Sequence, residues 1–294
     1  MGCLKNADFA RKNISSRADA VTAKADIALN EKTSPRQKLV ARISGPKYSI
    51  ITPTYQREDM LRLQYRGISE QSEADFEWLI LDDSPEPSPY FRTLTDNRVQ
   101  YRHVADRMSI GAKRNFLNEQ ARGEIIIHFD DDDYYSKDYV ATMAKCFDSS
   151  IDIAKLSGWY VYSQLYRELG YWDLTQMHGF HFCWSKEPMS YDFRIDYVKN
   201  RGSKSLLGFG FSYAYRRDCW KSKKFPDQNF GEDFGFIESV LADGGRLHQF
   251  ADTVGICVHI LHETNTSRCF PQYRLPSFMI ERLLPTWAIE TLNG

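Results

Sequence analysis

The residues of this sequence that are best suited to binding or catalysis are four consecutive aspartates, Asp130–Asp133. They directly follow the apolar run Ile125–Phe129. A short apolar run predicts a buried strand, and open α/β sheets bind ligands at the carboxyl ends of their strands. Crowded carboxylates raise one another's pKa unless a cation lies among them. The run therefore favours a hard divalent metal, which takes oxygen ligands and commonly brings substrate phosphates with it. Capping of the helix expected from Ser136 is the alternative, although it requires only one or two acids.

A second pair of acids, Asp82 and Asp83, follows the apolar run Leu79–Leu81. Capping does not explain these acids, because no long helix is expected to start at once. Two interpretations stay open. In the first, both are turn residues before Pro85; in the second, one of them accepts a hydrogen bond from a bound base or ribose.

A third pair, Glu232 and Asp233, comes directly after Gly231 at the start of a predicted helix. The helix dipole favours carboxylates at this position, so capping is one explanation. A carboxylate held near a reacting hydroxyl would instead act as a general base. Further along, His259 and His262 lie on a predicted apolar strand, where a histidine is more often a core residue than a metal ligand.

These groups need a scaffold, and the hydrophobic pattern predicts one in which strands and helices alternate. We expect a mainly parallel sheet with helices on both faces. After about Ser150 the sequence becomes rich in aromatic residues and less periodic. The expected strands are Tyr48–Thr52, Phe76–Leu81, Val99–Val104, Glu124–Phe129, Ser205–Tyr215 and Gly255–His262, and the expected helices are Asp59–Glu70, Gly111–Arg122, Ser136–Phe147 and Asp233–Ala242.

Composition narrows the class of protein. The chain has 294 residues, of which 42% are hydrophobic, as in ordinary globular proteins. No apolar run reaches the roughly 18–20 residues of a membrane span, and the charged start lacks a signal-peptide apolar region, so we expect a cytoplasmic protein. Six dispersed cysteines without a C-x-x-C pair are expected to be reduced thiols. The absence of G-x-G-x-x-G and Walker A sequences removes the main support for dinucleotide binding and triphosphatase chemistry.

The first 47 residues differ in charge from the rest of the chain. They carry ten Lys/Arg against four Asp/Glu, whereas the remainder carries 28 against 35. A weak amphipathic helix is expected between Ala18 and Leu29. Such a basic leader suits an anionic membrane surface or nucleic acid, but charge runs usually form a solvated helix face, which is the favoured interpretation. We expect peripheral membrane contact at most, and no nucleic-acid partner.

Several short motifs stand in an order that resembles a known family. They are Ser49–Tyr55 (SIITPTY), Leu81–Ser84 (LDDS), Gly111–Asn115 (GAKRN), the aspartate run, Gly208–Arg217 and Asn229–Asp233 (NFGED). Each motif alone is short enough to occur by chance. The ordered set is similar to a family 2 glycosyltransferase over about residues 48–265. The resemblance implies an α/β fold of the GT-A type, with a Rossmann-like, mainly parallel sheet.

The resemblance places one set of residues around a nucleotide sugar. The set consists of Thr52, Pro53, Thr54 and Tyr55 in one loop, Asp83 or Asp82 at the base, Lys113 and Arg114 at the diphosphate, and Asp130 and Asp131 near the ribose and sugar. A base stacked on Tyr55 would gain ~1–3 kcal/mol, and both cations donate N–H groups that suit anionic oxygens. An ordinary surface tyrosine is the alternative for Tyr55, and a solvated helix face is the alternative for Lys113.

The family's D-x-D pattern fits Asp130–Asp132 and makes Asp132 the metal ligand. A shift by one residue would make Asp133 the ligand instead. The family also places a metal-binding histidine some two dozen residues after its E-D pair, which gives His259, 26 residues after Asp233 (259 − 233), or alternatively His262. An imidazole beside carboxylates favours Mn²⁺ over Mg²⁺.

The resemblance further implies that Asp233 is the general base and that Glu232 completes the catalytic pair. We therefore predict a metal-dependent, inverting glycosyltransferase of the hexosyltransferase class. It would move a sugar from a nucleoside-diphosphate sugar, most simply a UDP-sugar, to a hydroxyl of a glycan, lipid-linked or protein acceptor. The alternatives are a haloacid dehalogenase-like, metal-dependent phosphatase and a non-catalytic carbohydrate-binding protein.

The expected organisation follows from the positions of the motifs. Residues 1–47 form a basic extension and residues 48–150 form the nucleotide-sugar-binding half. Residues 151–270 form the acceptor-binding and catalytic half, and residues 271–294 form a tail.

Overall fold

The computed structural model describes residues 45–187, 189–193, 206–265 and 268–293. Its centre is a group of parallel strands, in which β1 (Tyr48–Thr54) lies between β2 (Phe76–Asp82) and β4 (Ile125–His128), and β3 (Val99–His103) continues beyond β2. β1, β2 and β4 are short apolar runs that are almost wholly buried, as expected for parallel strands covered on both faces.

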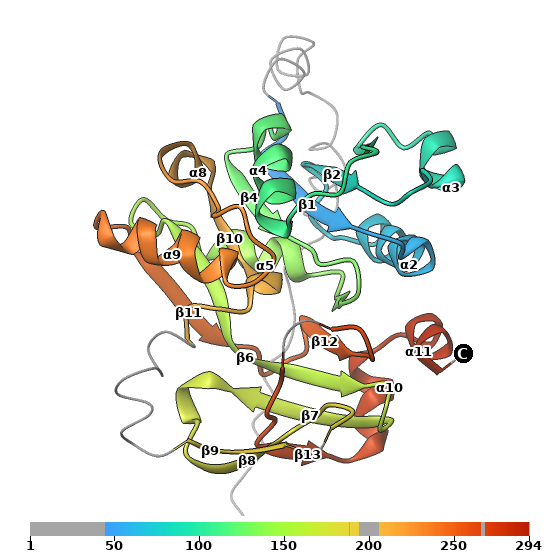
Figure 1. The fold of residues 1–294 in the computed structure, drawn as a ribbon, viewed down its shortest axis with the longest axis vertical. Helices are drawn as coiled ribbons and strands as arrows, with labels where there is room; N and C mark the ends of the chain where they lie inside the picture. Colours follow the sequence, from blue (N-terminus) through green and yellow to red (C-terminus); the bar gives the residue numbers. More distant parts are fainter. Residues whose placement is uncertain (1–44, 188, 194–205, 266–267, 294) are drawn as a thin grey trace, which may run out of the picture. The chain divides into compact units, whose positions relative to one another are not determined.

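Helices cover both faces of these strands (Figure 1). Successive strand residues point to opposite faces. Ile50 packs in one core with residues of α2 (Glu58–Ser69) and α5 (Tyr139–Lys145). Ile51 packs in a second core with residues of α4 (Ile110–Gln120) and α9 (Glu232–Ala242). The expected α/β sheet covered on both faces is confirmed.

The second half of the chain extends the sheet and makes it mixed. β10 (Ala214–Arg216) runs antiparallel to both β4 and the long strand β6 (Ile153–Ser163). β11 (Leu247–Ala251) and β12 (Cys257–Leu261) run parallel to β6, whereas β7 (Glu168–Asp173) is antiparallel to it and pairs in turn with β13 (Tyr273–Leu275). β8 (Gly179–Cys183) and β9 (Met189–Phe193) form a separate hairpin.

Smaller elements complete the described chain. They are α3 (Pro89–Thr93), β5 (Tyr134–Tyr135), η1 (Leu174–Gln176), η3 (Gly210–Ser212), α8 (Arg217–Ser222), η4 (Ser277–Met279), α10 (Ile280–Leu283) and α11 (Thr286–Asn293). None of the helices in the described residues is long and apolar enough to cross a membrane. The described cysteines are free.

Two expectations about the elements are wrong. Over Ser205–Tyr215, where we expect one strand, the described residues form a turn and then η3. The strand β10 begins only at Ala214. The glycines at 208 and 210 interrupt the strand pattern, and Phe209 between them has a positive φ of 67°. The helix expected over Ser136–Phe147 is shorter, because β5 and a turn precede it.

The sequence pattern also gave no indication of β6, although every residue of that strand is buried. Polar and small residues interrupt its apolar run, among them Lys155, Ser157 and Gly158. The expected basic extension lies outside the described residues, except for Gly45, Pro46 and Lys47, as does the helix expected between Ala18 and Leu29.

Candidate active site

The aspartate run leaves the carboxyl end of β4 directly beside the end of β1. The Thr52 hydroxyl donates to the Phe129 carbonyl at 2.8 Å, and the Thr54 hydroxyl donates to Asp131 Oδ2 at 2.6 Å. Thr52 also accepts a 2.9 Å hydrogen bond from the indole of Trp78. Both threonines are buried, so they fix the shape of the aspartate loop from β1.

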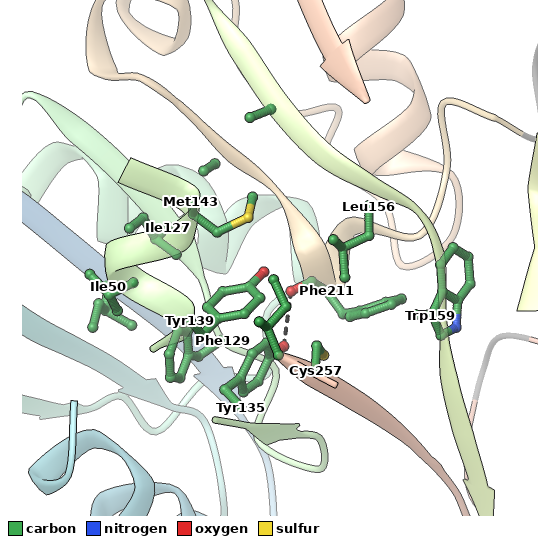
Figure 2. Close-up of a cluster of buried hydrophobic side chains, with 14 of the residues drawn as sticks. Ile50, Ile127, Phe129, Tyr135, Tyr139, Met143, Leu156, Trp159, Phe211 and Cys257 are labelled. Atoms are coloured by element: carbon green, nitrogen blue, oxygen red, sulfur yellow. Dashed lines mark hydrogen bonds between the residues drawn. The ribbon is translucent and has the colours of Figure 1, made fainter. Parts of the chain in front are cut away.

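Aromatic packing also stabilises the aspartate loop. The Phe129 ring stacks on Tyr135 with 4.0 Å between ring centroids, and Tyr139 packs edge-on against both (Figure 2). The Tyr135 hydroxyl accepts from the Asp130 amide at 3.0 Å and donates to the Phe211 carbonyl at 2.9 Å. The turn of the aspartate run is thus bonded to the segment that precedes β10.

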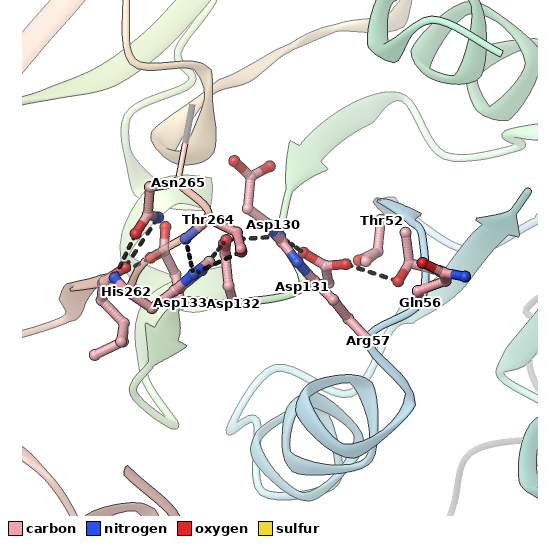
Figure 3. Close-up of polar contacts among 12 residues, drawn as sticks. Thr52, Gln56, Arg57, Asp130, Asp131, Asp132, Asp133, His262, Thr264 and Asn265 are labelled. Atoms are coloured by element: carbon pink, nitrogen blue, oxygen red, sulfur yellow. Dashed lines mark hydrogen bonds and ion pairs between the residues drawn. The ribbon is translucent and has the colours of Figure 1, made fainter. Parts of the chain in front are cut away.

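The four carboxylates lie in a site of concentrated negative charge. Burial, together with the charge of neighbouring aspartates, raises the pKa of Asp130 to about 7 and that of Asp131 to about 6. Arg57 lies between two of the acids, with 2.7 Å from Nη1 to Asp131 Oδ1 and 2.7 Å to Asp132 Oδ2 (Figure 3). Sequence reasoning missed Arg57, although a cation two residues after Tyr55 is a natural partner for so many acids.

Three of the aspartates could share a metal ion. Carboxylate oxygens of Asp130, Asp132 and Asp133 all lie within 4.8 Å of one another. Their oxygen chemistry fits a hard divalent cation, whose charge would favour the ionised form of these crowded carboxylates.

The two histidines of β12 and its end contact different aspartates. His259 Nδ1 lies 2.9 Å from Asp133 Oδ2, and the Ile260 amide donates to the same carboxylate at 2.9 Å. Although burial opposes it, the charge of Asp133 raises the pKa of His259 well above its ordinary value. His262 Nε2 instead lies 2.9 Å from Asp132 Oδ2.

The two acids at the end of β2, Asp82 and Asp83, are both buried, and both accept hydrogen bonds. Asp82 Oδ2 accepts from the Tyr101 hydroxyl at 2.6 Å. Asp83 accepts from Lys113 Nζ at 2.8 Å and from Arg107 Nη1 at 2.5 Å. These cations and the Met108 amide hold the pKa of Asp83 below its ordinary value, although burial alone would raise it.

Tyr55 lies at the edge of this group, beside the half-buried Pro53. The guanidinium of Arg107 stacks over the Tyr55 ring at 3.4 Å from its centroid. Lys113 is buried and also donates to the Thr54 carbonyl at 3.0 Å, so it is not on a solvated helix face. Arg107 is a second residue that the sequence did not indicate.

Arg114 joins the aspartate run to the E-D pair. Its side chain is buried, with Nη1 2.5 Å from Glu232 Oε1 and Nη2 3.4 Å from Asp130 Oδ1. Glu232 is buried against it, whereas Asp233 is partly exposed. Asp233 Oδ2 accepts from the Gly210 amide at 2.8 Å and Oδ1 accepts from the Phe234 amide at 2.7 Å. Arg114 therefore links Asp130 of the acidic cluster to Glu232, the residue before Asp233.

Comparisons with known proteins agree with this fold. Similar solved structures include the mannosyltransferase PcManGT from Pyrobaculum calidifontis in complex with GDP-Man and Mn²⁺, at 18% identity and a TM-score of 0.54, covering 75% of this chain and 59% of that one. TarS from S. aureus in complex with UDP-GlcNAc has 19% identity and a TM-score of 0.56, covering 74% of this chain and 60% of that one.

The putative glycosyltransferase EpsH of Bacillus subtilis (strain 168) is 24% identical over 188 residues, which are 62% of this chain and 51% of EpsH. The chain thus spans about half the length of this curated relative. The curled, mostly parallel sheet with its acidic site at the strand ends has the GT-A fold of these structures.

The sequence pattern of the family described as Glycosyl transferase family 2 matches residues 49–218. The chain belongs to that family. The predicted family and fold are confirmed.

Proposed function

We propose that this glycosyltransferase is metal-dependent and inverting, and that it uses a UDP-sugar as donor. The observation that carries the proposal is the short connection between two groups of acids. Arg114 contacts Asp130 of the cluster that suits a metal and Glu232 of the E-D pair. A donor diphosphate at the cluster would thus place its sugar within reach of Asp233.

We assign the metal to Asp132, with Asp130 and Asp133 close to it. His262 is the better imidazole partner, because it already bonds Asp132, whereas His259 is buried and paired with Asp133. The complex of PcManGT with Mn²⁺ supports Mn²⁺ as the ion, with Mg²⁺ as the alternative. A divalent ion bound there would neutralise charge on the departing diphosphate.

The nucleotide base would lie at Tyr55 and Asp83. Lys113 and Arg107 orient the Asp83 carboxylate, which in turn can bond a base edge once Arg107 moves from the Tyr55 ring. This assigns Lys113 to positioning Asp83 and the Thr54 carbonyl rather than to direct contact with the diphosphate. Arg57, which is partly exposed, is the better cation for phosphate oxygens.

Asp233 would remove the proton of the acceptor hydroxyl as that oxygen bonds the anomeric carbon and the bond to the diphosphate breaks. We place the acceptor, which a glycan, a lipid-linked sugar or a protein could provide, towards a pocket of about 320 Å³ beside His262. Trp184, Lys186 and Arg268 line this pocket and provide an aromatic face and N–H donors suited to a polar acceptor.

A donor panel tests the proposal. The full chain is incubated with UDP-GlcNAc, other UDP-sugars and GDP-mannose in Mn²⁺, in Mg²⁺ and in EDTA, and released nucleotide is measured. We expect slow release of UDP from one UDP-sugar, which EDTA abolishes. Release of GDP alone would overturn the uridine assignment, and equal rates in EDTA would overturn the metal. An α-configured product from an α-linked donor would overturn inversion.

A further inference from the structure

Lys155, in the middle of β6, is a wholly buried lysine. Lysine is almost never fully buried unless it is paired. No carboxylate in the part of the chain that the structure describes forms an ion pair with Lys155. Its ammonium instead donates to two carbonyls of one turn, Leu206 O at 2.7 Å and Gly208 O at 2.6 Å.

The turn that Lys155 holds is strained. Phe209 has φ 67° and ψ 64°, the left-handed region that side chains other than glycine rarely occupy. Such residues cost about 1–3 kcal/mol and persist only where surrounding contacts enforce them, often at functional sites. Of the two carbonyls that Lys155 binds, that of Gly208 directly precedes the strained Phe209, and that of Leu206 lies two residues earlier.

The last residue of the same turn, Gly210, contacts Asp233, the proposed general base. The Gly210 amide donates to Asp233 Oδ2 at 2.8 Å. A Cβ atom at position 210 would lie 2.9 Å from Arg114 Nη1 and 2.9 Å from Asp233 Cβ, so the backbone approaches both side chains as closely as only glycine permits. A small shift of the turn would therefore move the Asp233 carboxylate.

Further contacts hold the far side of the turn. Burial lowers the pKa of His128 well below its ordinary value, so its ring is neutral and Nδ1–H donates to the Gly210 carbonyl at 2.8 Å. Gln249 Nε2 donates to the Leu206 carbonyl at 2.8 Å but does not reach Gly208 in the structure. Among the residues that the structure describes, only Lys155 donates a hydrogen bond to the carbonyl of Gly208, the residue before Phe209.

We propose that Lys155 is a positioning residue for Asp233: its ammonium locks the turn 206–210, so that the Gly210 amide holds the Asp233 carboxylate towards the acceptor hydroxyl. This inference rests on the proposed role of Asp233 as general base. Burial lowers the pKa of Lys155 to about 7, and the charge of Asp233 opposes that shift.

The test compares Lys155→Met with Lys155→Gln and with Gln249→Leu as the matched control. Release of UDP from UDP-GlcNAc, or of GDP from GDP-mannose, is measured in Mn²⁺, with thermal melts of every variant. We expect Lys155→Met to lower kcat by about 10–100-fold, because small misplacements of a catalytic group have large effects, and to leave the donor KM within about twofold. Lys155→Gln, which restores N–H donors, should recover part of kcat, and Gln249→Leu should retain it.

A double variant separates positioning from general support. If Lys155 acts through Asp233, adding Lys155→Met to Asp233→Asn lowers kcat little further, because the two residues act as a unit. Additive losses, a wild-type kcat in Lys155→Met, or an equal loss in Gln249→Leu would each overturn the inference. If Lys155→Met does not fold, Lys155→Gln with the same double variant decides. If Asp233→Asn alone keeps wild-type kcat, the proposed function fails instead.

Discussion

Replacement of Asp233 by asparagine separates a general base from a helix cap. The carboxylate accepts two amide hydrogen bonds, from Gly210 on Oδ2 and from Phe234 on Oδ1. Asparagine has one carbonyl oxygen and can keep only one of these bonds. A hydrogen bond to a charged group is worth about 1.5–3 kcal/mol, and water can reach the partly exposed side chain, so we expect a loss of unfolding free energy at or below about 3 kcal/mol.

The expected effect on turnover is larger. Loss of a general base lowers kcat by roughly 10²–10⁴-fold, which corresponds to about 2.7–5.5 kcal/mol in the activation free energy. Donor affinity should change little, because Asp233 contacts neither the aspartate run nor Tyr55 in the described contacts. The assay is nucleotide release at saturating donor, beside a thermal melt and a titration of binding.

A matched control is Asp218→Asn, which changes another acid in the first turn of a helix, exposed and paired with Lys221. It should leave kcat unchanged. A folded Asp233→Asn protein whose kcat stays within about threefold of wild type would refute the assignment of Asp233 as general base. It would indicate that Asp233 acts only in helix capping.

Three further predictions concern the donor side. Asp132→Ala should abolish Mn²⁺-dependent UDP binding, measured by calorimetry, while the fold survives, because Arg57 keeps its contact with Asp131; unchanged Mn²⁺ dependence would contradict the metal assignment. His262→Ala should weaken Mn²⁺ binding, whereas His259→Ala should mainly lower the melting temperature, since it leaves the buried Asp133 carboxylate with the Ile260 amide but without its imidazole partner; the reverse pattern would restore His259 as the ligand. The pKa of Asp83 is lower in the folded chain, so its stabilisation is present above the unfolded pKa of about 3.9 and is lost as pH falls through the folded value. Urea unfolding should thus show a larger deficit for Asp83→Asn at pH 7 than at pH 3, and equal deficits would show that its charge does not matter.

The sequence was sufficient to predict the centre of the fold. β1, β2 and β4 are short runs in which apolar residues predominate, and α2 and α4 follow strands, so the types of these elements were predicted from pattern and order. The acids that come directly after Leu81 and Phe129 were predicted to follow strand ends, and they lie at one edge of the sheet because β1, β2 and β4 are parallel. The family and the GT-A fold followed from the order of those motifs.

Contacts between distant segments could not be predicted in this way. His259 and His262 are three residues apart, an odd spacing that turns side chains of an extended chain to opposite faces. Which of them meets Asp132 depends on how β12 pairs with β5 and β6, more than 90 positions earlier in the chain for β6. Arg57 and Arg107 were missed for the same reason, because each meets its acids only through the fold.

The buried hydroxyl of Tyr135 shows why the proposed donor site and the proposed general base are expected to respond together. It accepts from the Asp130 amide at 3.0 Å and donates to the Phe211 carbonyl at 2.9 Å. Phe211 follows Gly210, whose amide holds Asp233. Arg114 provides a second connection between the aspartate run and the E-D pair, because it contacts both Asp130 and Glu232. Since both connections begin at Asp130, a change in the aspartate run that moves its backbone is expected to move the carboxylate of Asp233 as well.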